Sequence, residues 1–466
     1  MNDKLVEQLS RHELEIDFIE LELTQRTAVN PIVYKGLGSV YQTNTGGLEL
    51  KFYYRFKDVS DSMKPKKSSM KEEVGKLISD ESFFDLTAID IYGKVWESKK
   101  LYMPEMNSLF PSAGKVVKIP LESIYHSKSI LKRDPLIVGK SYICSPEKDV
   151  AVLLIPGQFD LPFNEYTDTK TSSILNKLKI LLEPKHLIEM DKQPFEAIYT
   201  QKDRFLQLEI VASPDRSIDL EVVEHFRRSI EFLLGKVCNQ VLFTLYAGCN
   251  ELYQIFSYNK NFPNKSLPVP IKYQSIVNFK DFEKALICLM GCKKSFDVIY
   301  GYWHKSHRAF QGDIENGALS LTVSIEGLIN YFYKKYGLPD SDQKKFFDEC
   351  LDIVNALPSD RKLIEKLISS INYANKFSVN KAIFELIELG VLSKKQAKDW
   401  KDLRNKSAHA DPLNPDRKSL QKQINRYYSS LSVFYKLILS EVGYTGFAID
   451  YSSPGWPDQL VKPLKK

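Results

Sequence analysis

Arg404, Asn405 and His409 lie within six residues of the segment WKDLRNKSAHADP and combine a cation, an amide and an imidazole. On a helix, residues four apart share a face, so Asn405 and His409 would be neighbours, and the long Arg404 side chain could reach the same point. These residue types suit RNA cleavage without a metal ion. Histidine acts as general base or acid near neutral pH, and arginine offers a rigid fork of donors to phosphate. The segment therefore predicts a small site that handles phosphate, with Asn405 holding the imidazole or the phosphate in place.

The surroundings of this motif fit such chemistry. Pro412 disfavours helical geometry at the residue before it, so His409 is expected in the last turn of a helix. There the negative end of the helix dipole would favour the protonated imidazole. The stretch 394–426 holds ten Lys or Arg and four Asp, so its net charge of 10 − 4 = +6 equals that of the whole chain. This basic stretch would attract an RNA backbone.

The same residues could also have a purely structural role. Arg404 could pair with an acidic neighbour such as Asp402 or Asp399, and His409 could simply cap the end of a helix. Glu326 has two interpretations as well. It could be a second polar residue facing the site, or a solvated or capping residue on a long helix.

Motifs for nucleotide or metal chemistry are missing from the chain, which contains no GxxxxGK[ST], GxGxxG, HExxH, GxSxG or CxxC. Cys288 and Cys292, followed by His304 and His307, imitate a zinc finger. Their spacings of three, eleven and two residues differ from those of such fingers, and the apolar stretch ALICLMGC would bury Cys288. We expect core cysteines beside a polar helix, no metal site and no cofactor.

The elements that must carry these residues change character along the chain. Up to about residue 210, β-branched and aromatic runs broken by Gly, Asn, Asp and Pro predict strands. From about residue 280 the apolar period becomes 3.6, which predicts a helical bundle. The expected fold is α+β and multidomain. Its parts are a strand-rich N-terminal domain (1–215), a mixed α/β connecting region (216–300), a helical bundle (301–450) and a C-terminal tail (451–466).

Local signals refine this organisation. TNTGG between SVYQ and LELKFYY predicts a hairpin, GLG at Gly36 to Gly38 predicts a bend between strands, and the lysine-rich segment 61–73 predicts an exposed loop. A helix beginning near Asp219 should stop at Gly235, and a domain junction is expected between 258 and 275. The predicted helices of the C-terminal half are 282–291, 313–336, 342–355, 360–375, 381–389, 394–410 and 418–442.

Composition bounds the class of protein. With 466 residues, 43% hydrophobic and 27% charged, the chain is expected to be globular and to form more than one domain. Six cysteines are too few for a disulfide scaffold, so we expect them to be reduced core residues. No apolar run has the length of a membrane span, and the mixed-charge start is unlike a signal peptide. A cytoplasmic protein without membrane association is therefore expected.

At Arg404, Asn405 and His409 the sequence resembles the HEPN superfamily of helical ribonuclease domains. The family signature is Arg, a polar residue that is often Asn, and His a few residues later, and LRNKSAHA is similar to it. The stretch SIEGLINYF resembles the first helix of ApeA-like proteins of bacterial anti-phage defence, which also carry a strand-rich domain ahead of the helical one. The resemblance is specific over about 310–445 and architectural over 1–300.

The resemblance implies a role for each residue of the motif. Arg404 would bind and stabilise the scissile phosphate, His409 would be the acid or base, and Asn405 would orient them. In the family the active cleft forms where two motifs face each other, so the single motif of this chain implies a homodimer. RNA, for example tRNA, would be cleaved without metal to leave 2′,3′-cyclic phosphate and 5′-hydroxyl ends.

The resemblance also bears on regulation and on the alternative function. The strand-rich domain would act as a sensor or regulator, responding to a phage-derived trigger and causing abortive infection. Some members of the family are non-catalytic RNA-binding or protein-interaction modules, which is the alternative function for this chain. In a third interpretation the basic stretch 394–426 is only a solvated face.

Overall fold

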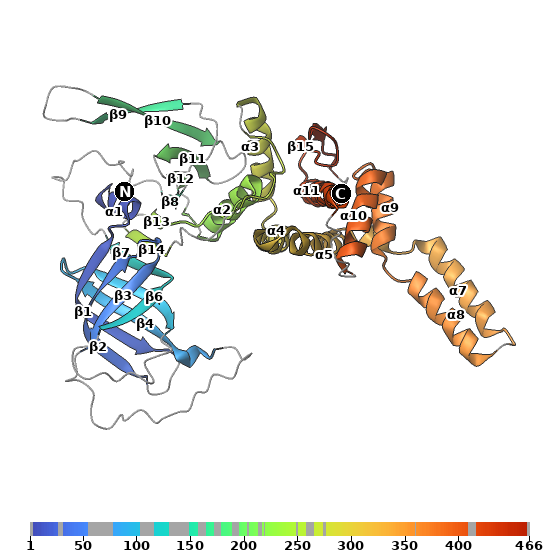
Figure 1. Cartoon of the computed structure of the whole chain (residues 1–466), viewed down its shortest axis with the longest axis horizontal. Helices are drawn as coiled ribbons and strands as arrows, with labels where there is room; N and C mark the ends of the chain where they lie inside the picture. The colour runs from blue at the N-terminus through green and yellow to red at the C-terminus, as the bar shows by residue number, and fades with distance from the viewer. Residues whose placement is uncertain are drawn as a thin grey trace. The chain divides into compact units, whose positions relative to one another are not determined.

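The computed structural model divides the chain into two compact units (Figure 1), and each is described by itself. The strand unit comprises Met1–Val223 and Cys238–Phe262, and the helical unit comprises Glu224–Val237 and Pro263–Lys466. The expected α+β organisation, strand-rich first and helical afterwards, is confirmed. The structure describes residues 3–26, 31–54, 78–102, 116–129, 149–156, 165–171, 179–188, 195–202, 205–212, 217–218, 220–247, 250–257, 265–273, 276–358, 360–408 and 416–463.

Within these described residues, the strand unit carries a fourteen-stranded sheet whose neighbouring strands pair antiparallel. Its order is β6-β3-β2-β1-β4-β5-β7-β14-β13-β8-β12-β11-β10-β9. Helix α1 (Asp3–Arg11) precedes the sheet, and the short 3-10 helix η2 (Asp80–Ser82) precedes β4. The strands are β1 (Glu15–Gln25), β2 (Val33–Gln42), β3 (Leu48–Tyr54), β4 (Phe83–Asp90), β5 (Val95–Tyr102), β6 (Val116–Leu121), β7 (Ser123–Ser129), β8 (Val150–Pro156), β9 (Glu165–Thr171), β10 (Lys179–Ile188), β11 (Phe195–Lys202), β12 (Phe205–Ala212), β13 (Leu242–Ala247) and β14 (Asn250–Phe256).

Side chains along each strand point alternately to the two faces of the sheet, and those on the inner face form the core of the strand unit. In β4 every second residue points inward, so that Phe84, Leu86 and Ala88 are buried while Thr87 faces solvent. The predicted hairpin at TNTGG is confirmed, because Gln42 pairs with Leu48 across it. Side chains from successive strands then form one apolar cluster, which includes Leu21, Val40, Leu50, Phe52, Ile119, Ile124, Leu154 and Ile255.

The expected bend at Gly36 to Gly38 is wrong. Both glycines lie inside β2 and pair with residues of β3. A Cβ atom at Gly36 would lie 2.2 Å from the Tyr53 carbonyl oxygen, and one at Gly38 would lie 2.3 Å from that of Lys51. The glycines therefore allow β3 to approach closely, and they do not turn the chain.

The region 216–300, expected as a connecting region, is shared between the two units. Its strands β13 and β14 belong to the sheet, and helix α2 (Leu220–Leu234) runs from the strand unit into the helical unit. The predicted stop of this helix is confirmed, since Gly235 has φ +63° and a Cβ there would lie 2.2 Å from the Leu267 carbonyl oxygen. The segment 61–73, predicted as a loop, lies outside the described residues.

The predicted helices of the C-terminal half are confirmed with ends shifted by a few residues, except that 313–336 is broken at Tyr333 into α5 and α6. The last two residues of the predicted helix 394–410 lie outside the described residues. The helices are α3 (Ile276–Met290), α4 (Lys293–Gly312), α5 (Ile314–Phe332), α6 (Lys334–Gly337), α7 (Ser341–Asn355), α8 (Arg361–Ala374), α9 (Val379–Glu388), α10 (Lys394–Ala408) and α11 (Arg417–Glu441).

Helix α5 lies at the centre of the helical unit and packs against α4, α10 and α11. Its apolar residues at helical spacing, including Leu321, Ile325 and Leu328, are fully buried. Its start is fixed by Asp313, whose side chain accepts from the Asn316 amide. No helix in the described part of the chain has both the length and the apolarity needed to cross a membrane.

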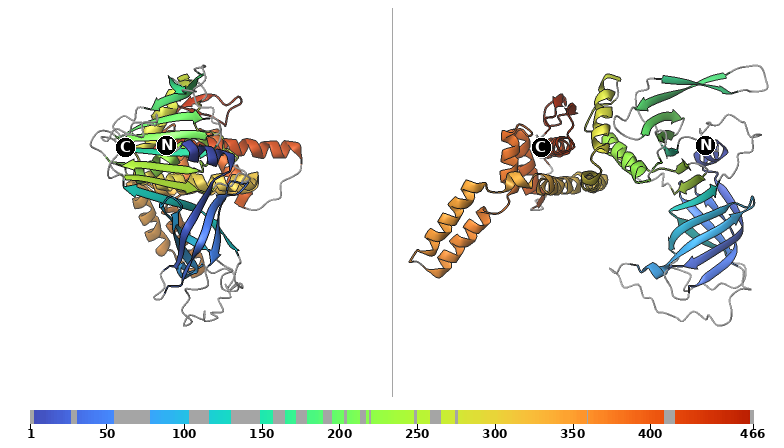
Figure 2. Two further views of the ribbon diagram at one scale, coloured as in Figure 1. Left: turned by 90° about the vertical axis from the view of Figure 1, so that its left-hand side faces the viewer. Right: turned by 180° about the vertical axis from the view of Figure 1, so that it is seen from behind.

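Residues 451–463, the described part of the expected tail 451–466, fold back onto the helical unit (Figure 2). Strands β15 (Phe447–Ile449) and β16 (Asp458–Leu460) form a small hairpin. The Tyr451 hydroxyl donates to the Val269 carbonyl at 2.7 Å, and Val461 is buried. Buried Lys436 on α11 donates to Gln396 and Gln459, which attaches this segment to the bundle.

Helix α4 buries a mixed face that includes Phe296, Ile299, Trp303 and His307. The His307 ring lies 5.3 Å from the Trp303 ring and is 3% exposed. Burial lowers the pKa of His307 from 6.5 to about 4, with a further lowering from His304. The imidazole is therefore neutral in the folded chain at pH values where it would be protonated in the unfolded chain.

We expect the helical unit to lose stability as the pH falls from about 6.5 to 4, because the unfolded chain then binds a proton that folded His307 excludes. The loss from this residue alone is about 3 kcal/mol. Thermal unfolding followed by circular dichroism across this pH range measures it. His307→Gln should flatten the curve, although burial also lowers the pKa of His225 and of His304. Parallel curves for the variant and the parent would contradict this assignment.

Candidate active site

One face of helix α10 is buried against the bundle, and this orients the side chains of Arg404 and Asn405 on the opposite face. Trp400 and Leu403 are 2% and 0% exposed, so they anchor α10 against the bundle. Arg404 and Asn405 follow on the outer side of the helix, and both are exposed. Arg404 and Asn405 thus lie on the outer side of α10 with their side chains open to a ligand.

Arg404 does not pair with a residue of its own helix. Its Nε atom donates to Oε1 of Glu326 on α5 at 2.5 Å. The Arg404 side chain keeps 46% of its surface exposed, and the Glu326 side chain keeps 27%. Glu326 therefore holds the guanidinium group while much of Arg404 stays accessible to an anion.

The structural alternative named the wrong partner for Arg404. Asp402 pairs with Arg426 of α11 at 2.5 Å, and this arginine is more enclosed than Arg404, with 19% of its side chain exposed. The second interpretation of Glu326, as a solvated or capping residue, is also wrong because its carboxylate faces Arg404. Two neighbouring ion pairs thus have different surroundings, and the exposed one belongs to the motif.

The remaining motif residues are placed only in part. Asn405 is exposed on α10 one residue after Arg404. His409 lies outside the described residues, directly after the last residue of α10, Ala408. Pro412 and the predicted location of His409 in the last helical turn lie outside them too.

Basic side chains surround the motif on two helices. On α10, Lys394, Lys395, Lys398 and Lys401 are exposed. The first turns of α11 add three more exposed cations, Arg417, Lys418 and Lys422. Asp402, in contrast, is neutralised by Arg426, and Asp416 caps α11 by accepting from the Ser419 amide. Lys395 donates to the Ser452 carbonyl, and the other exposed cations have the sign that a phosphate backbone requires.

The residues that imitate a zinc finger have other surroundings. The Cys292 thiol lies 3.9 Å from the Val442 carbonyl oxygen, and burial raises the pKa of Cys288. The rings of His304 and His307 pack on Tyr300 and Trp303. No group of three or more His, Cys, Asp or Glu among the residues that the structure describes could hold a metal ion.

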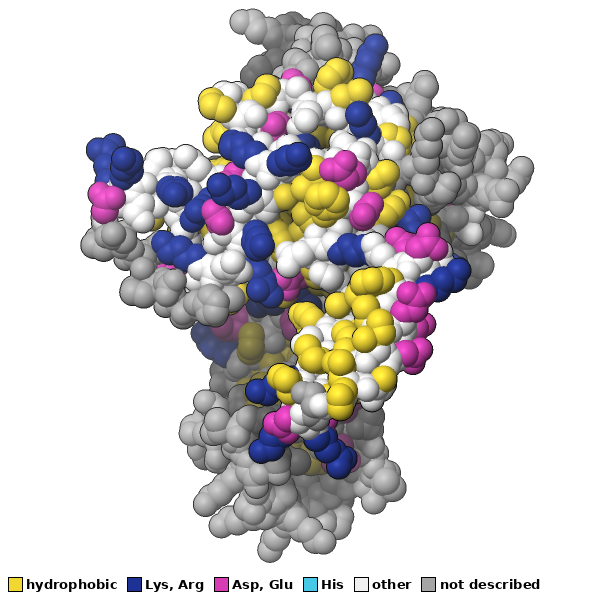
Figure 3. All heavy atoms as spheres, turned by 90° about the vertical axis from the view of Figure 1, so that its right-hand side faces the viewer, with side chains coloured by type: hydrophobic (Ala, Val, Ile, Leu, Met, Phe, Trp, Pro, Cys, Tyr) yellow, Lys and Arg dark blue, Asp and Glu magenta, His cyan; other side chains and the backbone are white. Residues whose placement is uncertain are grey.

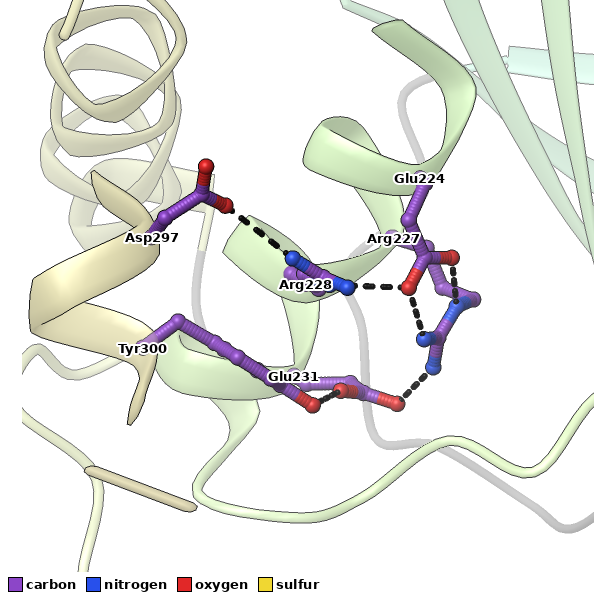
Figure 4. Close-up of polar contacts among 6 residues, drawn as sticks. All are labelled: Glu224, Arg227, Arg228, Glu231, Asp297 and Tyr300. Atoms are coloured by element: carbon purple, nitrogen blue, oxygen red, sulfur yellow. Dashed lines mark hydrogen bonds and ion pairs between the residues drawn. The ribbon is translucent and has the colours of Figure 1, made fainter. Parts of the chain in front are cut away.

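A second polar cluster joins α2 to α4 within the helical unit, and Figure 4 shows it. It consists of Glu224, Arg227, Arg228, Glu231, Asp297 and Tyr300. Arg227 bonds to Glu224 at 2.6 Å and to Glu231, whose side chain is 0% exposed. The Tyr300 hydroxyl donates to Glu231 at 2.5 Å.

The pKa shifts in this cluster show that its charges satisfy one another. Burial would raise the pKa of Glu224, but hydrogen bonds and charges from Arg227 and Arg228 lower it. Burial would lower the pKa of Arg227, but Glu224 and Glu231 raise it. Burial and the Glu231 carboxylate both raise the pKa of Tyr300. We therefore interpret the cluster as a link between helices, with fixed charges that no substrate is needed to compensate.

The strand unit has a surface pocket of its own, lined by residues of α1, β1, β4, β5 and neighbouring strands. Trp96 donates to Asp90 at 3.0 Å, and the His126 ring contacts the Val95 carbonyl at 2.7 Å. Exposed Tyr92 lies at its rim. The pocket combines aromatic and acidic groups that suit a small ligand better than an RNA backbone.

Comparisons with models of known protein families, with curated proteins and with solved structures found no match to this chain.

Proposed function

We propose that the chain is a metal-independent endoribonuclease of the HEPN type. The observation that carries the proposal is the exposed Arg404 on the outer face of α10, which pairs with Glu326 of α5, precedes Asn405 directly and lies five residues before His409 in sequence. A purely structural arginine gains most when it is enclosed, as Arg426 is. Arg404 instead keeps donors within reach of a phosphate.

The proposed reaction is attack of an RNA 2′-oxygen on the adjacent phosphorus. The P–O5′ bond breaks, which leaves a 2′,3′-cyclic phosphate and a 5′-hydroxyl. A base takes the 2′-hydroxyl proton, an acid protonates the leaving 5′-oxygen, and a cation stabilises the charge on the phosphoryl oxygens. Arg404 supplies the cation, His409 supplies the base or the acid, and Asn405 orients them.

The single motif supports a homodimer in this proposal. One imidazole cannot remove one proton and deliver another in the same step, so a second copy of His409 would complete the set of groups. The exposed lysines of α10 would hold the RNA backbone, and single-stranded loops such as those of tRNA suit this attack. The strand unit would sense a phage-derived trigger in anti-phage defence, and its pocket suits such a role.

The proposal is tested on the full chain with total tRNA in EDTA, followed by analysis of the new RNA ends. We expect 2′,3′-cyclic phosphate and 5′-hydroxyl ends at full yield without metal. Cleavage that needs magnesium would contradict the histidine mechanism. Salt-sensitive RNA binding without new ends would instead support the alternative, a non-catalytic RNA-binding module.

A further inference from the structure

Helices α7 and α8 form an antiparallel hairpin that projects from the helical unit (Figures 1 and 2). Neither helix contains a buried residue, although both are well formed and begin with side-chain caps at Asp340 and Asp360. Isolated helices of this length are marginal in water, and most helical stability in proteins comes from packing of an apolar face. The hairpin therefore lacks the burial that would stabilise it.

The contact between the two helices uses only part of their apolar surface. On α7 the seam consists of Phe347, Leu351 and Val354, and on α8 it consists of Ile364, Ile368 and Ile371; all six are half-buried. These positions recur at three- and four-residue spacing, as a helix-helix seam requires.

A second apolar stripe on each helix is largely uncovered. On α7 it runs through Phe346, half-buried Cys350 and Ile353 and continues to Leu357; Phe346 and Ile353 are 61% and 63% exposed. On α8 it runs through Leu363 and Leu367, which are 52% and 40% exposed. In both helices the stripe begins one residue before the seam, so it is rotated from the seam in the same sense by about a quarter turn.

Because the two helices are antiparallel, equal rotations bring both stripes to one side of the hairpin. The result is a continuous apolar face, which we call the hairpin face; it consists of Phe346, Cys350, Ile353, Leu357, Leu363 and Leu367. Figure 3 looks towards the end of the helical unit and shows hydrophobic side chains gathered there, with acidic side chains along one edge. An apolar face rimmed by charges is typical of an interaction surface.

The charges of the hairpin indicate which partner covers the face. Helix α7 has four acidic and two basic residues, a net of −2, and α8 has three basic and one acidic, a net of +2. The helical spacing places Asp342 and Glu349 beside the stripe of α7, and Lys362 and Lys366 beside that of α8. All four are exposed. The face thus carries one acidic and one basic edge.

We propose that the hairpin face binds the same face of a second copy of this chain. A two-fold axis would lay α7 of each copy along α8 of the other and form a four-helix bundle. The acidic edge of each α7 would then meet the basic edge of the partner's α8, while a face-on pairing of like helices would oppose like charges. The inference rests on the hairpin alone, so it can hold or fail independently of the proposed ribonuclease activity.

The first test measures the mass of the full chain by sedimentation as a function of concentration. The unmodified chain should form dimers, and Ile353→Asp with Leu363→Asp should weaken dimerisation by about 30-fold or more, as loss of central interface anchors does. The matched control is Asn372→Asp. Asn372 is exposed on the same hairpin, and its helical position lies on the side of α8 opposite the hairpin face. Circular dichroism checks that every variant keeps its helices.

The second test exchanges the charges. A chain with Asp342→Lys and Glu349→Lys has two basic edges, and a chain with Lys362→Glu and Lys366→Glu has two acidic ones. Each should be weaker than the unmodified chain at forming its own dimer, and the mixture should form heterodimers. A monomeric unmodified chain, Asp variants that associate as strongly as the unmodified chain, or a mixture without heterodimers would each overturn the proposal.

Discussion

Arg404→Ala is expected to lower the rate of RNA cleavage by about 100- to 1,000-fold, the usual cost of losing one donor to the developing charge in a transition state. The fold should tolerate the change, because Arg404 keeps 46% of its side chain exposed and such ion pairs contribute little stability. Arg404→Lys should recover only part of the rate, since an ammonium group lacks the two-pronged geometry of guanidinium. Single-turnover cleavage of a defined RNA measures both.

Two further variants separate this role from a general effect of charge. Lys401→Ala removes an exposed cation from the same helix, and it should weaken RNA binding slightly and reduce its salt dependence while sparing the chemical step. Glu326→Gln keeps the shape of the partner but loses its charge, so it should lower the rate less than Arg404→Ala does. Equal cleavage rates for Arg404→Ala and Lys401→Ala would show that Arg404 has no special role in the reaction.

Glu231→Gln is expected to destabilise the helical unit by about 3 kcal/mol, because it removes the buried carboxylate that compensates Arg227. The side chain of Glu231 is 0% exposed, so water cannot replace the lost charge. Thermal unfolding followed by helical circular dichroism reports the change, since most helices lie in this unit.

Asp297→Asn supplies the control within the same cluster. Asp297 bonds to Arg228 at 3.1 Å, but its side chain is 74% exposed, so its loss should cost less than about 1 kcal/mol. Similar destabilisation by both variants would show that the cluster is no buried link between α2 and α4.

The local pattern of the chain predicts most elements because each rests on neighbours in sequence. The hairpin at TNTGG and the end of α2 at Gly235 follow from turn and capping chemistry that a few residues determine. The bend predicted at the glycines of β2 was wrong because their role depends on β3. The carbonyl oxygens of that strand lie where Cβ atoms of other residues would be. The bounds of α4 were not predicted, since its buried face includes His307 and Ser306 along with apolar residues.

In the candidate site, too, local features could be predicted from the sequence and contacts between distant residues could not. The spacing of Arg404 and Asn405 on one helix could be read from the sequence, and so could the local excess of lysine. Glu326 could be named as a polar residue that faces the site, but its pairing with Arg404 could not be predicted, because the two residues are 78 positions apart and meet only through the packing of α5 against α10. Asp402 was an equally good partner by sequence, and its pairing with Arg426 likewise depends on how α11 lies against α10.

The most direct measurement is tRNA cleavage in EDTA by the full chain and by His409→Ala, prepared and assayed side by side. The account predicts 2′,3′-cyclic phosphate ends with the unmodified chain and a loss of rate of about 100-fold or more with His409→Ala, while RNA binding stays near its original strength. Equal cleavage by both proteins, or no cleavage by either, would contradict the central claim that this motif is a ribonuclease site.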